Sequence, residues 1–357
     1  MSLAETLSAQ VNRAAYTASQ ASRVAWYVGH YAMGRHLMGP MSQPGHAPQA
    51  DQSAPLDRKR LQKQFRALFE RDWRNIAAGV YKMPQEVRGL KSPARLASAS
   101  RDYLRDARAV ARRQKERGHS EVLRADTREK FPRYFLQNFH YQTDGWLSEQ
   151  SADRYDMQVE TIFTGAGHAM RRQALPFVRD AIADRDPSET RLVDLGCGDG
   201  GFLLGVKENW PRLHCTALDL SPAYLGKAQA RLGRFDDIVF KRRAAEDSGL
   251  PPQSVDIVTA VYLYHELPPR VREAVVSEVA RIVKPGGSMI LVDTIQYGDE
   301  PGFDILLENF PRGLHEPYYD SYCKTDLEEL FGRCGFSRQD ESLAFLSKVT
   351  HFVKTAK

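Results

Sequence analysis

The stretch LVDLGCGDGGF, residues 192–202, constrains the fold more than any other segment. A short apolar run containing one acid, Asp194, is followed by four glycines in six positions. The apolar run is typical of a buried strand, and glycines allow left-handed backbone and a close approach of ligand to the amides. The stretch therefore predicts a strand, a ligand-binding turn and a helix in succession.

The same alternation continues to the end of the chain. We expect strands at residues 191–195, 214–218, 237–241, 255–260, 287–293, 336–343 and 345–354. We expect helices near 200–209, 222–232, 268–283 and 324–334. Strands that alternate with helices predict an α/β fold, here a doubly wound, mostly parallel seven-stranded sheet with helices on both faces.

The N-terminal part has a different pattern. Residues 1–130 read as an all-α accessory region, and residues 131–190 as an aromatic-rich connecting or lid segment with a helical stretch near 156–183. Residues 191–357 form the predicted ligand-binding domain. Within the accessory region we expect helices at 3–39, 56–79 and 93–118, and a Pro/Gly/Gln-rich linker at 38–55.

Charge is distributed unevenly. Of the net charge of +5, residues 55–130 carry 21 Lys/Arg against 10 Asp/Glu, so the rest of the chain is net acidic. A basic region can bind an anionic partner such as RNA or a membrane surface. We favour the simpler interpretation, solvated faces of amphipathic helices.

Cysteine usage and the N-terminus bear on the compartment. Cys197, Cys215, Cys323 and Cys334 form no CxxC pair, which argues against a structural metal or a disulfide scaffold and favours a reducing compartment. The first residues lack the pattern of a secretory signal, and the apolar window 24–38 is too short to span a membrane. We expect a cytoplasmic protein without a metal.

Two acids narrow the choice of ligand for the glycine turn. Gly196, Gly198 and Gly201 satisfy G-x-G-x-x-G, which alone is a weak dinucleotide signal. Asp194 would oppose a pyrophosphate at the helix N-terminus but suits the ammonium group of S-adenosylmethionine. Asp219 ends the second strand and can accept ribose hydroxyls, which both ligands possess. The pair therefore predicts S-adenosyl-L-methionine as cofactor.

Five motifs occur in a familiar order over residues 156–354: VDLGCGDG, ALDLSPAYL, AAEDSGLPPQSVDIV, YLYHELPP and ARIVKPGGSMILVD. With this spacing the chain resembles the class I S-adenosylmethionine-dependent methyltransferases, and most of all the branch of ubiquinone/menaquinone-biosynthesis methyltransferases. The resemblance implies a Rossmann-like methyltransferase fold, this cofactor and a methyl-transfer reaction.

The resemblance also implies positions for the cofactor. The residues assigned to it are Asp194, Gly196, Cys197, Gly198 and Gly200 around the methionine part, Asp219 at the ribose, Leu220 and Ala245 at the adenine, and Tyr262 nearby. One departure concerns the adenine amino group, because Ala244 stands where the family often has Asp. Backbone groups at Ala245, or the carboxylates of Glu246 and Asp247, can replace it. We choose Glu246, whose other interpretation is a solvated loop acid.

The exit of the fourth strand, AVYLYHELPP, is the predicted catalytic segment. His265 titrates near neutral pH and can serve as general base for a phenol or enol oxygen, with Tyr264 beside it. In the family a histidine here often only caps the following helix, and this alternative stays open.

Two aromatic segments are candidates for the acceptor side. His140, Tyr141 and Trp146 lie in NFHYQTDGWLSE, and His315, Tyr318 and Tyr319 lie in the segment 302–326, which we take for a loop. Ordinary aromatic packing in a surface crossover explains the second segment equally well. Arg171 and Arg172 are expected to be solvated helix residues rather than clamps for the cofactor carboxylate.

The function predicted is methylation of a small aromatic or lipophilic acceptor at O or C. The tetrapeptide of nucleobase-nitrogen methyltransferases and the Pro-Cys nucleophile of C5-cytosine chemistry are both missing, so nucleic acid is not the favoured partner. An RNA methyltransferase using the basic region and a non-catalytic cofactor-binding assembly protein remain alternatives. For residues 1–130 we expect a lid or a homodimerisation layer, with peripheral membrane contact as the minority alternative.

Overall fold

The computed structural model describes residues 3–38, 55–88, 93–116, 118–183 and 185–355. Its centre is a seven-stranded sheet with the order β3-β2-β1-β4-β5-β7-β6. The strands are β1 (Arg191–Leu195), β2 (His214–Asp219), β3 (Ile238–Arg242), β4 (Val255–Val261), β5 (Val283–Thr294), β6 (Phe336–Ala344) and β7 (Ser347–Lys354). The predicted mostly parallel sheet is confirmed. It is mixed in detail, since β7 runs antiparallel to β5 and β6.

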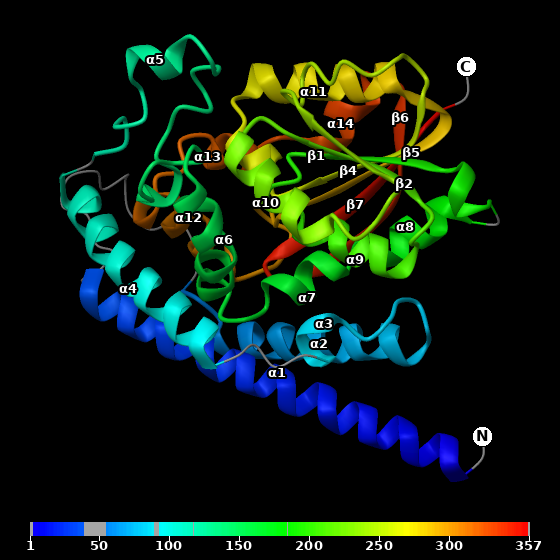
Figure 1. Cartoon of the computed structure of the whole chain (residues 1–357), viewed down its shortest axis with the longest axis horizontal. Coiled ribbons are helices and arrows are strands. Elements are labelled where there is room, and N and C mark those ends of the chain that lie inside the picture. The colour runs from blue at the N-terminus through cyan, green and yellow to red at the C-terminus, as the bar shows by residue number, and fades with distance from the viewer. Residues whose placement is uncertain (1–2, 39–54, 89–92, 117, 184, 356–357) are drawn as a thin grey trace.

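Helices cover both faces of the sheet, as the alternation predicts (Figure 1). One face packs on α8 (Leu175–Ile182), α9 (Gly201–Asn209) and α10 (Pro222–Leu232). The other packs on α11 (Pro269–Ile282) and α14 (Leu327–Gly332). Neighbouring residues of a strand point to opposite faces, so Leu192 belongs to the first core and Val193 to the second.

The segment 302–326 is not a loop, and this expectation was wrong. It holds α12 (Asp304–Gly313) and α13 (Tyr319–Cys323), whose residues Leu307, Tyr319 and Tyr322 are buried in the second core. Pro311 lies inside α12 and α13 spans little more than one turn. Both features hide a helical pattern from sequence, because proline is a helix breaker and short helices show no full period.

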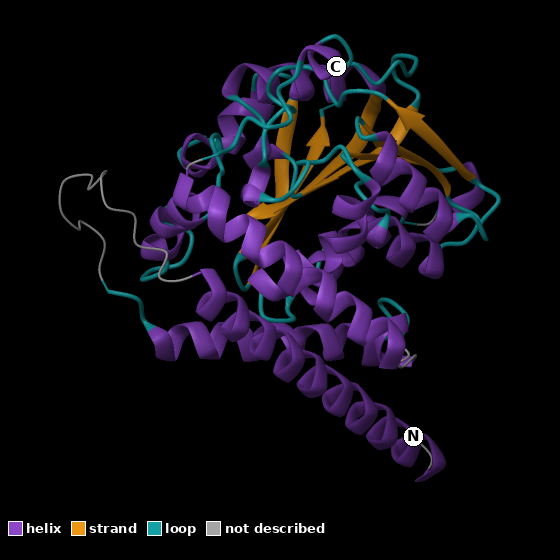
Figure 2. Ribbon diagram, turned by 60° about the vertical axis from the view of Figure 1, so that its left-hand side comes forward, coloured by secondary structure: helices purple, strands orange, loops and turns teal. Residues whose placement is uncertain are grey.

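The N-terminal helices form a layer below the sheet domain (Figures 1 and 2). They are α1 (Leu3–Met38), α2 (Arg58–Ala77), α3 (Gln85–Arg88) and α4 (Pro93–Glu116). Helix α1 contacts α4 and α6 (Glu149–Ile162), while α2 contacts α7 (Gly167–Arg172). Shorter elements are α5 (Ala125–Arg128) and the 3-10 turns Phe139–Tyr141, Pro187–Glu189 and Tyr264–Glu266. Residues 39–54, which make up nearly all of the expected linker, are not among the described residues.

Buried ion pairs attach this layer to the sheet domain. Asp72 of α2 is fully buried and accepts hydrogen bonds from Arg172 of α7 and from the hydroxyls of Tyr16 and Tyr81. Arg71 donates to the hydroxyl of Ser342 and the carbonyl of Leu343 in β6. Helix α2 therefore binds both α7 and the edge of the sheet.

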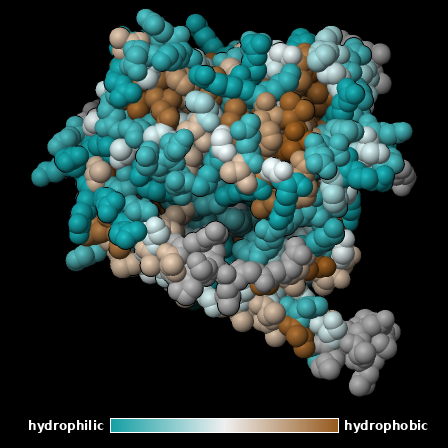
Figure 3. All heavy atoms as spheres, in the orientation of Figure 1, coloured by the Kyte–Doolittle hydropathy of each residue, from teal (hydrophilic) through white to brown (hydrophobic). Residues whose placement is uncertain are grey.

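The distribution of apolar side chains on the surface tests whether the protein contacts a membrane. Among the described helices, none is both long and apolar enough to cross a bilayer. On the face shown in Figure 3, apolar side chains occur in separate patches among polar ones. Five of the six exposed large hydrophobic side chains of the described residues lie on α1, and peripheral membrane contact stays a prediction.

Candidate active site

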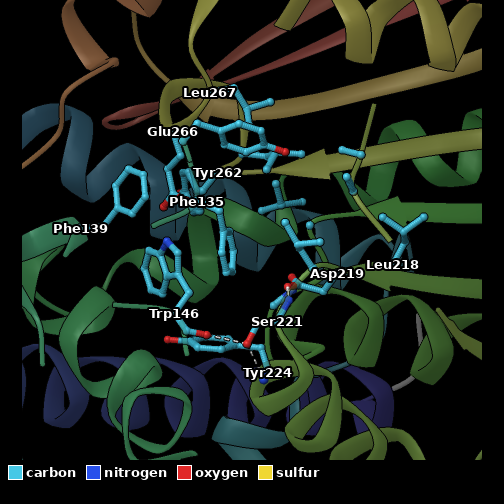
Figure 4. A pocket seen from close by; sticks show the side chains of 18 of the residues that line it. Phe135, Phe139, Trp146, Leu218, Asp219, Ser221, Tyr224, Tyr262, Glu266 and Leu267 are labelled. Atoms are coloured by element: carbon cyan, nitrogen blue, oxygen red, sulfur yellow. Dashed lines mark hydrogen bonds between the residues drawn. The ribbon is translucent and has the colours of Figure 1, made fainter. Parts of the chain in front are cut away.

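A cleft opens at the carboxyl ends of β1, β2 and β4. Strand order reverses between β1 and β4, the place where open α/β sheets bind their ligands. The glycine turn and the end of β2 form one side of the cleft, and aromatic side chains form the other. In Figure 4, Leu218, Asp219 and Ser221 lie opposite Phe139, Trp146 and Glu266.

The glycine turn takes the conformation that its sequence predicts. Gly196, Gly198 and Gly200 have φ of 66°, 54° and 77°, the left-handed region in which a side chain is strained. Gly196 and Gly198 line the cleft. Gly200 does not, and a Cβ there would lie 2.9 Å from Leu232 Cδ1. Cys197 is also buried behind the wall. These last two residues shape the turn instead of lining the cleft.

Asp219 ties the turn to the end of β2. Its Oδ2 accepts a hydrogen bond from the Gly198 amide and its Oδ1 from the Ser221 amide, both at 2.8 Å. Burial raises its pKa, although these backbone bonds act in the other direction. Leu220 and Ala245 line the cleft beside it. The acid, the apolar residue after it and the loop that follows β3 thus form one continuous wall.

Asp194 lies beneath this wall and not on it. Only 1% of it is exposed, and its Oδ1 accepts a hydrogen bond from the Thr259 hydroxyl at 2.6 Å. No ion pair to Asp194 occurs among the described residues. Burial raises the pKa of this carboxyl to about 7; the Thr259 bond opposes the rise and the charge of Asp219 adds to it. The carboxylate is therefore buried beside the glycine turn without a compensating cation.

The aromatic side of the cleft comes mainly from residues 131–155. Trp146 is its centre, with ring centroids 5.7 Å from Phe139, 5.8 Å from Tyr155 and 5.5 Å from Tyr224. Trp146 lines the cleft, as predicted for the acceptor side. No described residue of the region 1–130 lines it. The aromatic-rich connecting segment thus forms this wall, and the described N-terminal helices lie outside it; a lid function of either region stays a prediction.

Glu246, predicted to contact the adenine, lies next to the cleft wall but does not line it. Ala244 and Ala245 line the cleft, and Glu246 lies one residue beyond them. Its Oε1 accepts a hydrogen bond of 2.7 Å from the hydroxyl of Tyr134, a wall residue. Its Oε2 is buried without a hydrogen-bond partner among the described residues. Glu246 is therefore a half-buried acid with one buried oxygen, and its role toward adenine stays a prediction.

The two tyrosines at the exit of β4 lie in different environments. Tyr262 lines the cleft with φ of 57°, and its hydroxyl lies 2.7 Å from Ser347 Oγ. Tyr264 is fully buried in the core, where its ring stacks on Phe331 at 5.9 Å. A side chain in the core is not placed to touch an acceptor, so we replace the catalytic assignment of Tyr264 with a packing role.

His265 is held by a buried carboxylate behind the wall. Its Nδ1 lies 2.6 Å from Asp293 Oδ1, and Asp293 Oδ2 accepts the backbone N–H groups of Tyr264 and His265. Burial lowers the pKa of His265, but the Asp293 charge and hydrogen bond outweigh it and raise the value to about 9. His265 is therefore cationic at neutral pH and does not line the cleft, which disfavours a role as general base.

Glu266 belongs to the same strand exit, where the sequence places it on the substrate side without a catalytic role. It lines the cleft, and its carboxylate makes no hydrogen bond or ion pair with any residue that the structure describes. A carboxylate without a protein partner on a ligand-binding wall is a candidate for contact with substrate.

The other acceptor-side candidates form a layer behind the aromatic wall. His140 Nε2 lies 2.8 Å from Glu316 Oε1, and the ring of Tyr319 lies 5.9 Å from that of His265. His315 stacks on His119 at 4.2 Å. The structure thus brings the two predicted segments together. Five of the predicted residues, however, do not line this cleft: His140, Tyr141, His315, Tyr318 and Tyr319.

Arg171 and Arg172 are buried, which corrects the expectation that both are solvated. Arg172 pairs with Asp72 and Glu86. The guanidinium of Arg171 lies 5.9 Å from the ring centroid of Tyr155 and 5.8 Å from that of Tyr262, two residues of the cleft wall. Both partners of Arg172 lie in the N-terminal layer, far away in sequence, and this explains why a local helical pattern missed its burial.

The fold and the cleft define a Rossmann-like α/β domain with a ligand site at its switch point. Residues 192–287 match a family model described as a methyltransferase domain. Carboxy-S-adenosyl-L-methionine synthase of Aeromonas salmonicida is 28% identical over 34% of this chain and 50% of its own length. The 2-ketoarginine methyltransferase of Streptomyces arginensis is 28% identical over 45% of this chain and 52% of its own.

The chain thus spans about half the length of these curated relatives. The solved structure of the CurJ carbon methyltransferase is 15% identical, with a TM-score of 0.46, and covers 94% of this chain and 91% of that one. The family match, the relatives and the sheet order show a class I S-adenosylmethionine-dependent methyltransferase domain. The resemblance to the ubiquinone/menaquinone branch stays a prediction.

Proposed function

We propose that the protein transfers a methyl group from S-adenosyl-L-methionine to a small aromatic or lipophilic acceptor, at oxygen or carbon. The observation that carries this proposal is the two-sided cleft. The glycine turn with Asp219 forms one side, and a wall of aromatic rings around Trp146 forms the other. Apolar rings bind an apolar acceptor by excluding water, and they orient it by offset and edge contacts.

The residues present fit the cofactor. Asp194 is buried without a cation, and the ammonium of a methionine moiety is the kind of group that would compensate it. Asp219 is fixed by two amides and retains acceptor capacity toward a ribose diol. Bare backbone at Gly196 and Gly198 permits close approach. When bound, the cofactor supplies an electrophilic methyl group on a sulfonium sulfur.

The chain's own residues orient the acceptor and exclude water. Hydrogen bonds fix the hydroxyls of Tyr134 and Tyr262, so both rings are held in place. A rigid wall reduces the motions that an acceptor must lose before reaction. This arrangement also supports our proposed division of the chain into a helical layer (1–130), a segment that walls the cleft (131–190) and a cofactor-binding domain (191–357).

The setting that we propose is cytoplasmic, with a small molecule as acceptor. All four cysteines are free thiols, as is usual in a reducing compartment. A cleft lined by aromatic rings supports a small acceptor over an RNA strand. The positive charge of residues 55–130 is the observation that favours RNA. A homodimer through the N-terminal helices stays a prediction.

Two measurements test the proposed function. Calorimetry should show binding of S-adenosylhomocysteine that Asp219→Asn weakens at least tenfold and that Asp180→Asn, at an exposed ion pair on α8, leaves unchanged. Incubation with methyl-labelled S-adenosylmethionine and a small-molecule extract of the host cells should yield a labelled apolar product. Binding that is insensitive to Asp219, or label found only in RNA, would contradict the proposal.

A further inference from the structure

The cleft wall carries few groups that can take up a proton. Four tyrosines line it. The hydroxyls of Tyr134, Tyr224 and Tyr262 are hydrogen-bonded to neighbouring side chains, and burial raises the pKa of Tyr155, which keeps that hydroxyl protonated. The two carboxylates of the wall are Asp219 and Glu266. Asp219 is held by two backbone amides and is the acid that we assign to the cofactor ribose, so Glu266 is the wall carboxylate left for an acceptor.

Glu266 faces a second polar group that has no partner. Trp146 is 7% exposed, and its indole Nε1 has no hydrogen-bond partner among the described residues. In Figure 4 this nitrogen and the carboxylate of Glu266 point toward one another beside the ring of Phe139. A buried N–H group without a partner is unfavourable, so this end of the cleft is suited to a bound polar group.

The surroundings of Glu266 favour proton uptake. Burial raises its pKa, and the charges of Glu316, Asp293 and Asp219 raise it further, against the cation His265. Tyr155 of α6 and Tyr224 of α10 also line the cleft; burial raises the pKa of both, and the charge of Glu266 adds to the rise. A carboxylate in such surroundings is a stronger base than one in water, which is how enzymes adapt carboxylates to proton transfer near neutral pH.

We propose that Glu266 is the catalytic base of the reaction, and that the Trp146 N–H holds an oxygen of the acceptor beside it. This inference rests on the proposed function. The acceptor O–H or acidic C–H bond breaks, and its proton passes to a carboxylate oxygen of Glu266. The released electron pair forms the bond to the methyl carbon, and the pair of the broken carbon–sulfur bond stays on sulfur. The protonated Glu266 then returns its proton to water.

His265 acts as a positioning residue in this scheme. Its imidazole is anchored on Asp293, and its charge lies next to Glu266 in the same turn. The pair Asp293–His265 therefore fixes the turn and keeps the carboxylate of Glu266 ionised to a degree that it would not reach alone.

The test compares three variants of the full chain. Glu266→Gln removes the base at nearly constant shape, Glu266→Asp keeps a carboxylate, and Glu273→Gln is a control on the exposed face of α11. The probes are S-adenosylhomocysteine in calorimetry, and methyl-labelled S-adenosylmethionine with the host small-molecule extract at several pH values. Thermal unfolding establishes that each variant is folded.

We expect Glu266→Gln to bind S-adenosylhomocysteine within twofold of wild type and to lose about 10²-fold in transfer, with the acid limb of the pH–rate profile abolished. Glu266→Asp should recover part of the rate and the acid limb, and Glu273→Gln should match wild type. Transfer by Glu266→Gln within threefold of wild type overturns the assignment of Glu266 alone. If the wild type binds the probe but labels nothing, the proposed function fails and this base fails with it.

Discussion

Asp72 and Arg172, 100 positions apart, meet as a two-pronged ion pair in which Nε and Nη2 lie 2.9 and 2.6 Å from the two carboxylate oxygens. Both residues are buried, and Tyr16 and Tyr81 donate to the same carboxylate. This single acid therefore connects α1, α2 and α7.

Asp72→Asn should lower the free energy of unfolding by about 3–5 kcal/mol, because it leaves the buried guanidinium of Arg172 without its main counter-charge. Urea denaturation monitored by circular dichroism measures the change. Glu70→Gln is the control on the same helix, since its pair with Arg13 is largely exposed and should contribute nothing measurable. Equal stability of the two variants would contradict the role of Asp72.

Asp194→Asn should weaken S-adenosylmethionine binding, by about 2 kcal/mol for a lost charged contact, and should stabilise the ligand-free protein above pH 7. The pKa of Asp194 is raised to about 7, so its folded state binds the proton more tightly than the unfolded chain does. Stability of the wild type should thus fall as the pH rises from about 4 to 7, and the variant should lose this slope. A variant that binds as tightly as wild type would exclude Asp194 from cofactor recognition.

His265→Gln should change the pH dependence of stability in a more alkaline window, between about pH 6.5 and 9. The pKa of His265 is raised to about 9 in the folded state, mainly by Asp293 against the effect of burial. Its contribution is complete below pH 6.5 and is lost as the pH rises to 9. Thermal unfolding across this window should show a decline in the wild type that the variant lacks. Identical profiles would mean that the imidazolium is not the form held by Asp293.

Gly200→Ala should destabilise the protein by about 1–3 kcal/mol, since φ is left-handed and the new methyl would meet Leu232 and Ala228 of α10. Gly226→Ala is the matched control in α10, with nothing within 4 Å of the added Cβ. Helix propensity predicts a gain of about 0.5–1 kcal/mol there. Denaturant midpoints of the two variants should therefore move in opposite directions.

The sheet domain was predictable because its signals are local. The central strands β1, β4 and β5 contain apolar runs next to helical patterns, and the glycine turn needs residues of one type at fixed places. Burial of Arg171 and Arg172 and the packing of Tyr264 depend on partners far away in sequence, such as Asp72 and Phe331. The same holds for Glu266, which becomes conspicuous only when Trp146 is seen opposite to it.

The pairing of Asp72 with Arg172 also sets an order of events during synthesis. A ribosome adds about 5–20 residues per second, so Asp72 is made some 5–20 s before its partner. During that interval the apolar side chains that α2 buries against α7, Leu68 among them, have no surface to cover them. The N-terminal helices must therefore wait as a loosely packed group, open to chaperones, until α7 leaves the ribosome.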